Sequence, residues 1–276
     1  MNGNRLKISV ITPVFNGEDM IRSCMHSVGM QTYGNKEHVI VDGLSTDNTV
    51  AVINANTYGH VKLISEKDSG LYDAFNKGIR IAEGDVICFL SADDMYAHEN
   101  VLQSVADTFL SNEQAQMVYG DIVYVERRNL SKVVRYWKSS SFKNGLFRKG
   151  WMAPNTALFI RKEVFFKYGV FELKYKLASD YELQYRFFQL HQLNSLYLPG
   201  IMVRMRSGGL SNSSMSNIYQ SLSECRAALR SHRVPLGWLP IMNTLLYRLR
   251  QTRIPAEIQN LNNRQLLSLA EAEVFK

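Results

Sequence analysis

The chain has 276 residues and a formal net charge of +7, and 46% of its residues are hydrophobic and 21% charged. This composition is typical of a folded globular protein and does not indicate disorder. Its three cysteines (Cys24, Cys88 and Cys225) are far apart and form no CxxC pair, which argues against a disulfide framework and a zinc site. No apolar run approaches the roughly 20 residues of a membrane span, and the N-terminal run is too short for a signal peptide, so we expect a cytoplasmic protein.

The first third of the chain alternates predicted strands with predicted helices. β-Branched and apolar runs that end at turn residues predict the strands, and amphipathic spacing predicts a helix after each of the first three. This order is typical of a mostly parallel sheet with helices on both faces, an α/β fold. The predicted strands cover residues 7–14, 38–41, 61–65 and 85–91, and the helices begin near Asp19, Thr49 and Leu71.

A cluster of polar or turn-forming residues follows each of these four strands. The clusters are Thr12–Asn16, Asp42–Asp47, Asp68–Gly70 and the pair Asp93-Asp94. Ligands of parallel α/β sheets bind beyond the carboxyl ends of the strands, where these clusters converge. The sequence therefore predicts an active site at that edge of the sheet.

The pattern changes after residue 115. Strands are predicted over 117–125, 133–137 and 156–160 as a smaller, mixed extension of the sheet, with helices over 162–168 and 179–191. A small-residue linker (207–217) is followed by a helical pattern that Pro235, Gly237 and Pro240 interrupt. We therefore predict a domain over residues 1–213 and a C-terminal helical extension over 214–276.

Two stretches concentrate the positive charge. Ten Lys or Arg residues and no acid occur from Arg127 to Lys162, and six Arg and no acid from Arg226 to Ala256. Both are consistent with solvated basic faces, and both are consistent with contact to a polyanion such as a pyrophosphate or an anionic lipid surface.

The acidic side chains at the strand ends also have two interpretations. Carboxylates such as Asp93 and Asp94 are the oxygen ligands that Mg²⁺ or Mn²⁺ takes together with substrate phosphates, but the same residues form helix caps and turns. Asp42 is a turn former or a hydrogen-bond acceptor for a nucleotide base or ribose. Local pattern alone does not decide either case.

Four segments occur in order with regular gaps: TPVFNGEDMIRSCMHSV, VIVDGLSTDNTV, SEKDSGLYDAFNKGIRIAEGDVICFLSADD and ASDYELQYR. Over about residues 6–212 the chain resembles the inverting, nucleotide-sugar-dependent glycosyltransferases of family 2, which have the GT-A fold. DSGLYDAFNKGI and LSADD are similar to the bacterial branch that builds O-antigen, colanic acid and capsule. The resemblance implies transfer of a sugar from a nucleotide-diphosphate donor, with UDP the usual nucleotide.

The same resemblance implies roles for individual residues. Asp93 and Asp94 match the site for Mn²⁺ or Mg²⁺, and Asp180 matches the general base that takes the proton of the acceptor hydroxyl. Glu182 is the alternative base, and a helix cap is the structural alternative for Asp180. Asn76 and Lys77 are also consistent with a solvent-facing amide and a surface charge. The implied donor-binding residues are Thr12, Pro13, Phe15, Asn16, Asp42, Ser45, Asp47, Asp68, Asn76, Lys77 and Asp93.

At two positions the implied role is open. Relatives often carry Pro-His where this chain has Pro154-Asn155, so Asn155 can act there only as a neutral hydrogen-bonding group. Asp121 recurs in similar sequences, and we interpret it as structural or acceptor-facing.

The implied acceptor is a glycan or a sugar on a polyprenyl pyrophosphate at the inner face of the cytoplasmic membrane. Residues 226–253 include LGWLPIMNTLLYRLR, which is consistent with a peripheral membrane segment or with a hairpin packed on protein. A non-catalytic nucleotide-sugar-binding scaffold is the alternative function. A nucleic-acid binder is disfavoured because no recognition motif is present.

Overall fold

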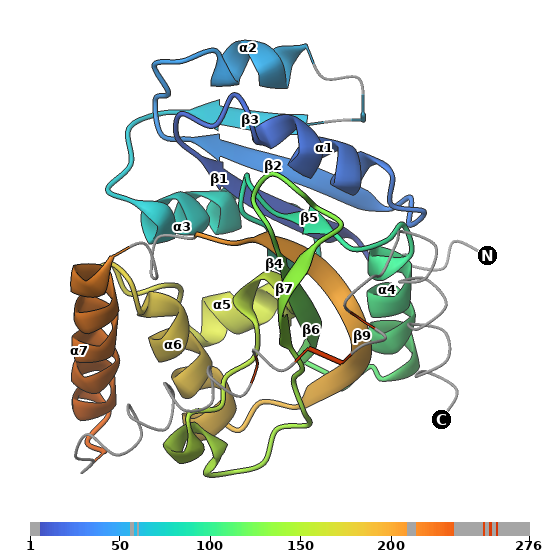
Figure 1. Ribbon diagram of the computed structural model, residues 1–276. Helices are drawn as coiled ribbons and strands as arrows, with labels where there is room; N and C mark the ends of the chain where they lie inside the picture. Colours follow the sequence, from blue (N-terminus) through green and yellow to red (C-terminus); the bar gives the residue numbers. More distant parts are fainter. Residues whose placement is uncertain are drawn as a thin grey trace.

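The computed structural model describes residues 6–55, 58–59, 61–208, 214–234, 251, 254–255 and 258. One nine-stranded sheet runs through the molecule in the order β3-β2-β1-β4-β8-β6-β9-β5, and β7 pairs with β6 off this path. Helices cover both faces of the sheet (Figure 1). This is the α/β architecture that the sequence predicts, with a larger antiparallel share in its second half.

The first four strands are parallel and in the predicted places. Apolar, β-branched runs form them; these runs are largely buried in β1, β2 and β4 and partly exposed in the edge strand β3. Helices on the intervening segments provide the crossovers. The strands are β1 (Ile8–Val14), β2 (Lys36–Asp42), β3 (Val61–Ser65) and β4 (Val86–Phe89), and the helices are α1 (Ile21–Gly29), α2 (Thr49–Asn54) and α3 (Leu71–Ile81).

The second half of the sheet is mixed. β8 (Leu158–Arg161) is antiparallel to both β4 and β6 (Met117–Val125), and β7 (Val133–Trp137) is antiparallel to β6. β9 (Ser195–Arg206) runs parallel to β6 and antiparallel to the short β5 (Met95–Tyr96). β8 was predicted slightly early, because Asn155–Ala157 forms the 3₁₀ turn η2.

Three elements were not predicted: β5, β9 and the helix α4 (Val101–Ser111). In β9 the register against β6 slips, since Tyr119 pairs with Tyr197 while Asp121 pairs with Ile201. The extra residues of β9 include Pro199 and Gly200, which form a bulge. That Pro-Gly pair divides the apolar run, and a divided run does not indicate a strand.

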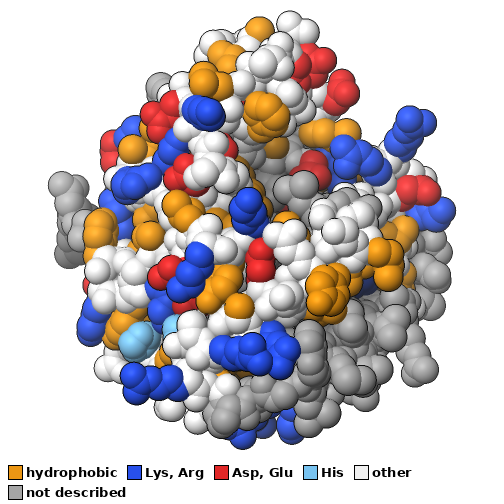
Figure 2. Space-filling model, turned by 90° about the vertical axis from the view of Figure 1, so that its left-hand side faces the viewer, with side chains coloured by type: hydrophobic (Ala, Val, Ile, Leu, Met, Phe, Trp, Pro, Cys, Tyr) orange, Lys and Arg blue, Asp and Glu red, His pale blue; other side chains and the backbone are white. Residues whose placement is uncertain are grey.

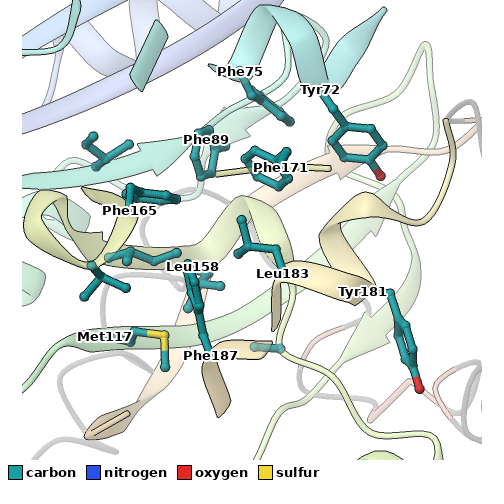
Figure 3. Close-up of a cluster of buried hydrophobic side chains, with 14 of the residues drawn as sticks. Tyr72, Phe75, Phe89, Met117, Leu158, Phe165, Phe171, Tyr181, Leu183 and Phe187 are labelled. Carbon is teal, nitrogen blue, oxygen red and sulfur yellow. The ribbon is translucent and has the colours of Figure 1, made fainter. Parts of the chain in front are cut away.

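Alternate side chains of the central strands build two cores, one on each face of the sheet. Ile11 and Phe89 belong to the core beneath α3, α5 (Lys162–Tyr168) and α6 (Ser179–Gln184), and Figure 3 shows its aromatic side chains between these helices. Val10 and Cys88 belong to the core beneath α1 and α4. The sheet is therefore buried on both sides, as a parallel sheet requires.

The predicted helix over 179–191 is divided in two. After α6 the chain continues as a π-helical turn, η3 (Tyr185–Leu190). α7 (Met215–Ser231) stands beside α6 (Figure 1), and its Leu229 is buried in the α3/α6 core. A further 3₁₀ turn, η1, covers Leu146–Lys149.

The remainder of the predicted extension is described at a few positions only. The backbone oxygen of Gln251 accepts a hydrogen bond from Tyr136 N (3.2 Å), and Ile258 packs in a small core with Val125. The apolar part of the predicted membrane segment, residues 235–250, lies outside the described residues. Within the ranges that are described, no helix has both the length and the apolar character needed to span a membrane.

Candidate functional site

The loops that follow β1 and β2 are joined to each other at the predicted edge of the sheet. Asn16 N donates to Ser45 Oγ (2.8 Å), and Thr46 N donates to Asn16 Oδ1 (2.8 Å). Glu18 N donates to Asp47 Oδ2 (3.2 Å). The structure thus brings Asn16, Ser45 and Asp47 together, as the four-cluster pattern predicts.

Both loops carry backbone strain. Asn16 (φ 49°) and Leu44 (φ 63°) adopt the left-handed conformation, which costs a residue other than glycine roughly 1–3 kcal/mol. Asn16 is held there by its bonds to Ser45 and Thr46 of the other loop. Next to them Phe15 is 63% exposed and Leu44 is 50% exposed. Exposed apolar side chains on strained loops are typical of a ligand-binding surface.

The side chain of Thr12 does not face this surface, and its place in a base pocket stays a prediction. It is fully buried, and its Oγ1 lies 2.8 Å from Nε2 of His38. Burial lowers the pKa of His38 to about 3, so the imidazole is neutral. Pro13 is buried as well. Side chains within β1 point into the two cores, and only residues beyond its end are exposed.

Asp42 is also turned inward. It is fully buried, and its carboxylate accepts hydrogen bonds from Ser45 N (3.1 Å) and Ser65 Oγ (2.6 Å). In this arrangement the carboxylate holds the β2 loop. The assignment of Asp42 to a nucleotide base stays a prediction.

Asp68 lies against this loop from the β3 side. Its Oδ1 accepts from Gly70 N (2.9 Å), and a Cβ at Gly43 would be only 2.7 Å from Asp68 Oδ2. Glycine at position 43 is what allows this approach. The Lys77 ammonium is 3.0 Å from Glu66 Oε1 and bonds the carbonyl of Lys67, so it ties α3 to the segment after β3.

Asn76 has a contact that the sequence did not indicate. Its Nδ2 donates to Phe171 O (2.9 Å), and its Oδ1 accepts from Phe171 N (3.0 Å). The side chain is 6% exposed and therefore does not face solvent. Asn76 fixes the segment before α6 to α3, and its assignment to the donor site stays a prediction.

The acidic pair at the end of β4 is held by Arg206, the last residue of β9. Arg206 N donates to Asp94 Oδ1 (3.2 Å), and Arg206 Nη1 donates to Asp93 O (2.7 Å). The guanidinium also bonds Ser23 Oγ on α1 (3.2 Å). Burial, reinforced by the charge of Asp93, raises the pKa of Asp94 well above its usual range.

These residues fit a divalent cation that is also bound by substrate. Asp94 is fully buried, and its Oδ2 has no hydrogen-bond partner in the described part of the chain. An ion at this oxygen would remove the cost of an unpaired buried acceptor. No cluster of three or more His, Cys, Asp or Glu side chains able to hold a metal occurs among the described residues. Mg²⁺ sites often use one or two carboxylates and complete their shell with phosphates and water.

Asp180 lies at the start of α6, and α3 holds it directly. Tyr72 Oη donates to Asp180 Oδ1 (2.9 Å), and Tyr72 stacks on Phe171 with ring centroids 5.3 Å apart. Asp180 is half-buried, and the same Oδ1 also accepts from the next amide, Tyr181 N (2.9 Å). Tyr72 projects from α3 toward α6 in Figure 3.

Glu182, the alternative base, is a structural ion pair instead. It is 2% exposed, and its oxygens are 2.8 Å from Arg186 Nη2 and 2.8 Å from His232 Nε2. Both carboxylate oxygens are therefore occupied by cationic or hydrogen-bonding partners. This corrects the alternative and leaves Asp180 as the candidate base.

Asp121 is structural. It is fully buried in β6, where Ser139 N (2.7 Å), Tyr136 Oη (2.7 Å) and Tyr197 Oη (2.9 Å) donate to it. Asn155 is half-buried at the start of η2, and its Oδ1 makes no hydrogen bond with any described residue.

The sequence analysis missed Tyr72 and Arg206. Tyr72 stands inside the motif DSGLYDAF, in which the polar residues are the usual candidates for a site. Its position on the helical repeat of α3 and its burial are those of a core residue. Arg206 ends the strand that was not predicted. The one available signal was a pair of arginines at alternate positions, Arg204 and Arg206, in an otherwise apolar run.

Comparison with known proteins agrees with this fold. Residues 9–172 match the sequence profile of "Glycosyl transferase family 2". A PGL/p-HBAD biosynthesis glycosyltransferase of Mycobacterium bovis is 31% identical over 208 residues, which is 74% of this chain and 78% of that protein. The expected likeness to the O-antigen, colanic acid and capsule branch is not specific, because this relative is named for a different biosynthesis.

Two solved structures share the fold at low identity. S. aureus TarS (residues 1–349) in complex with UDP-GlcNAc has a TM-score of 0.60 and 17% identity, over 89% of this chain and 72% of TarS. The mannosyltransferase PcManGT from Pyrobaculum calidifontis, in complex with GDP-Man and Mn²⁺, has a TM-score of 0.57 and 14% identity, over 99% and 81%. With a family match that spans more than half of its length, the chain belongs to glycosyl transferase family 2 and has a GT-A fold.

Proposed function

We propose that this glycosyltransferase moves a sugar from a UDP-sugar onto an acceptor hydroxyl with inversion, and that Asp180 is the general base. One observation carries the proposal: Tyr72 fixes the Asp180 carboxylate to α3, the helix that begins directly after the Asp68 loop. Through α3, the candidate base is connected to the edge of the sheet where the strained loops and the acidic pair lie.

The donor would bind over the loops after β1 and β2. Phe15 and Leu44 offer exposed apolar surface for the base, while Asn16, Ser45 and Asp47 hold the loops in shape. Asp68 and Lys77 stand at the neighbouring end of β3 and are proposed donor contacts. Support comes from TarS, which shares the fold and has been solved in complex with UDP-GlcNAc.

Asp93 and Asp94 would hold Mn²⁺ or Mg²⁺ against the donor diphosphate. When bound, the ion supplies positive charge that stabilises the leaving nucleotide diphosphate. The protein's own part is to present the unpaired Oδ2 of Asp94 and to keep the pair in place through Arg206.

Asp180 would take the proton of the acceptor hydroxyl as that oxygen attacks the anomeric carbon from the face opposite the diphosphate. A hydrogen bond from Tyr72 to one oxygen of Asp180 orients the carboxylate, and its other oxygen is the one considered for the acceptor proton. A carboxylate held in this way is competent as a base at neutral pH.

The proposed acceptor is a glycan or a sugar on a polyprenyl pyrophosphate, reached by peripheral contact with the cytoplasmic membrane. We keep residues 1–213 as the transferase domain and 214–276 as its helical extension. Over the described residues of the face in Figure 2, basic side chains alternate with acidic and hydrophobic ones. Such a surface differs from the continuous basic face that binds nucleic acid.

Calorimetric titration with UDP, GDP and dTDP, each with and without Mn²⁺, tests the donor assignment. We expect one nucleotide, UDP, to bind in a metal-dependent manner, and Asp94→Ala to weaken that binding. Asp107→Ala, a substitution of an acid on the outer helix α4, is the control and should bind like the wild type. If no nucleotide binds under any condition, the transferase proposal is wrong.

A further inference from the structure

We infer that α7 is a working part of the active site and that Glu224 on α7 is a positioning residue for Asp180. This inference rests on the proposed function, since it assigns Asp180 as the base. It extends that function by giving the helical extension a role in catalysis.

Glu224 holds the backbone just before the candidate base. Its Oε2 accepts hydrogen bonds from Leu177 N (2.7 Å) and Ala178 N (3.1 Å), two successive amides that precede α6. Gln220, one turn earlier on α7, donates to the other oxygen of Glu224 (2.9 Å). The carboxylate is therefore fixed on one side by its own helix and fixes the start of α6 on the other.

A second contact holds α6 on the far side of Asp180. His232, which follows α7, lies 2.8 Å from Glu182 Oε1, and its ring stacks on Tyr185 with centroids 5.7 Å apart. Between the two polar contacts, Leu229 anchors α7 in the core at 3% exposure. Asp180 thus lies between two such contacts: Glu224 of α7 holds Ala178, two residues before it, and His232, just after α7, holds Glu182, two residues after it.

The third support comes from the opposite direction. Tyr72 on α3 donates to Asp180 Oδ1, and this bond has the right length only while the start of α6 keeps its distance from α3. A general base must be within about 2.6–3.2 Å of the oxygen whose proton it takes, and small displacements of a reacting group are costly. A loss of the Glu224 contacts should therefore move Asp180 without touching the donor loops.

The experiment compares Glu224→Ala, Glu224→Gln and Ser223→Ala in the full chain. Ser223 is the exposed neighbour of Glu224 on the same helix and provides the matched control. The readout is release of UDP from UDP-GlcNAc, UDP-glucose or UDP-galactose, whichever the wild type turns over fastest, with water as the acceptor. Calorimetry gives the donor Kd of each variant.

We expect Glu224→Ala to lower kcat about tenfold or more, with the donor Kd and KM within about twofold of the wild type. Glu224→Gln keeps an oxygen that can accept from both amides, so it should retain at least about a third of kcat. Ser223→Ala should match the wild type. If the alanine variant does not fold, Glu224→Asp, which withdraws the carboxylate by one methylene, makes the same comparison.

Two results would overturn the inference. One is a folded Glu224→Ala (or Glu224→Asp) variant with wild-type kcat. The other is an equal loss of kcat and donor binding, since a general loosening of the fold would give that result. A wild type that binds no nucleotide and releases no UDP would instead contradict the proposed function, so the two failures are distinguishable.

Discussion

Substitution of Asp121 tests two opposing effects on stability: burial of its carboxylate in β6 is unfavourable, and the three hydrogen bonds that it accepts are favourable. Ser139 N, Tyr136 Oη and Tyr197 Oη all donate to this fully buried carboxylate. Asp121→Ala leaves all three donors without their acceptor. A buried unpaired donor costs about 1–3 kcal/mol, and the two hydroxyls can rotate whereas the Ser139 amide cannot, so we expect a loss of about 3 kcal/mol relative to Asp121→Asn.

The pH dependence gives a sharper test. Burial raises the pKa of Asp121 from 3.8 to about 6, against the opposing effect of its hydrogen bonds. The folded state then binds the proton more tightly than the unfolded state. Stability from this group is present below the unfolded pKa and is lost as pH rises through about 6. The loss is about 2–3 kcal/mol at roughly 1.4 kcal/mol per pH unit.

The assay is urea unfolding of the wild type, Asp121→Asn and Asp121→Ala at pH 4 and pH 7. Asparagine keeps one acceptor and does not titrate, so we expect it to be about 1 kcal/mol less stable than the wild type at pH 4. At pH 7 the order of these two should reverse, because only the wild type has lost the pH-dependent contribution. A stability difference that is the same at both pH values would refute the argument that burial dominates at Asp121.

Three further predictions concern the site and its support. Tyr72→Phe removes the hydroxyl that orients Asp180, so kcat should fall about 5- to 30-fold with donor KM unchanged in steady-state kinetics, and equal kcat would exclude a positioning role. Arg206→Met removes the guanidinium that bonds Asp93 O and Ser23 but keeps the backbone donor to Asp94, so calorimetry in the presence of UDP should show Mn²⁺ affinity about tenfold weaker, and unchanged affinity would contradict a role of the guanidinium in holding Asp93. Gly78→Ala places a methyl group against the Ile11 side chain in the core and should cost about 1–3 kcal/mol in urea unfolding; a stabilised variant would show that α3 packs less closely on β1.

The parallel half of the fold could be predicted because local pattern and tertiary structure agree there. β1 to β4 are short apolar runs, each ended by turn residues, and their bounds differ from prediction by a few residues. β9 could not be predicted, since its pairing with β6 and β5 is decided by contacts distant in sequence and its bulge interrupts the pattern. The division of the 179–191 helix into α6 and η3 likewise has no local signal.

For the candidate site, the sequence located the edge but not the direction of each side chain. Polar residues at strand ends are equally consistent with a ligand contact and with support of a loop, and Thr12 and Asp42 proved to be buried. Asp180 and Glu182 are two residues apart and both are acidic. Only the structure shows that the two carboxylate oxygens of Glu182 are paired with Arg186 and His232. Such distinctions depend on residues brought in from other elements.

The measurement that tests the central claim most directly is turnover by Asp180→Asn, beside Glu182→Gln, with donor binding measured on the same preparations. We expect Asp180→Asn to bind the UDP-sugar with wild-type affinity and to lose about 10²- to 10⁴-fold in kcat, because an amide cannot take the acceptor proton. Glu182→Gln removes the charge of both ion pairs but keeps a side chain of the same length that can hydrogen-bond Arg186 and His232, so it should be less stable but should keep most of its kcat while folded. An Asp180→Asn enzyme with wild-type kcat, or a folded Glu182→Gln enzyme without turnover, would contradict the assignment of Asp180 as the base.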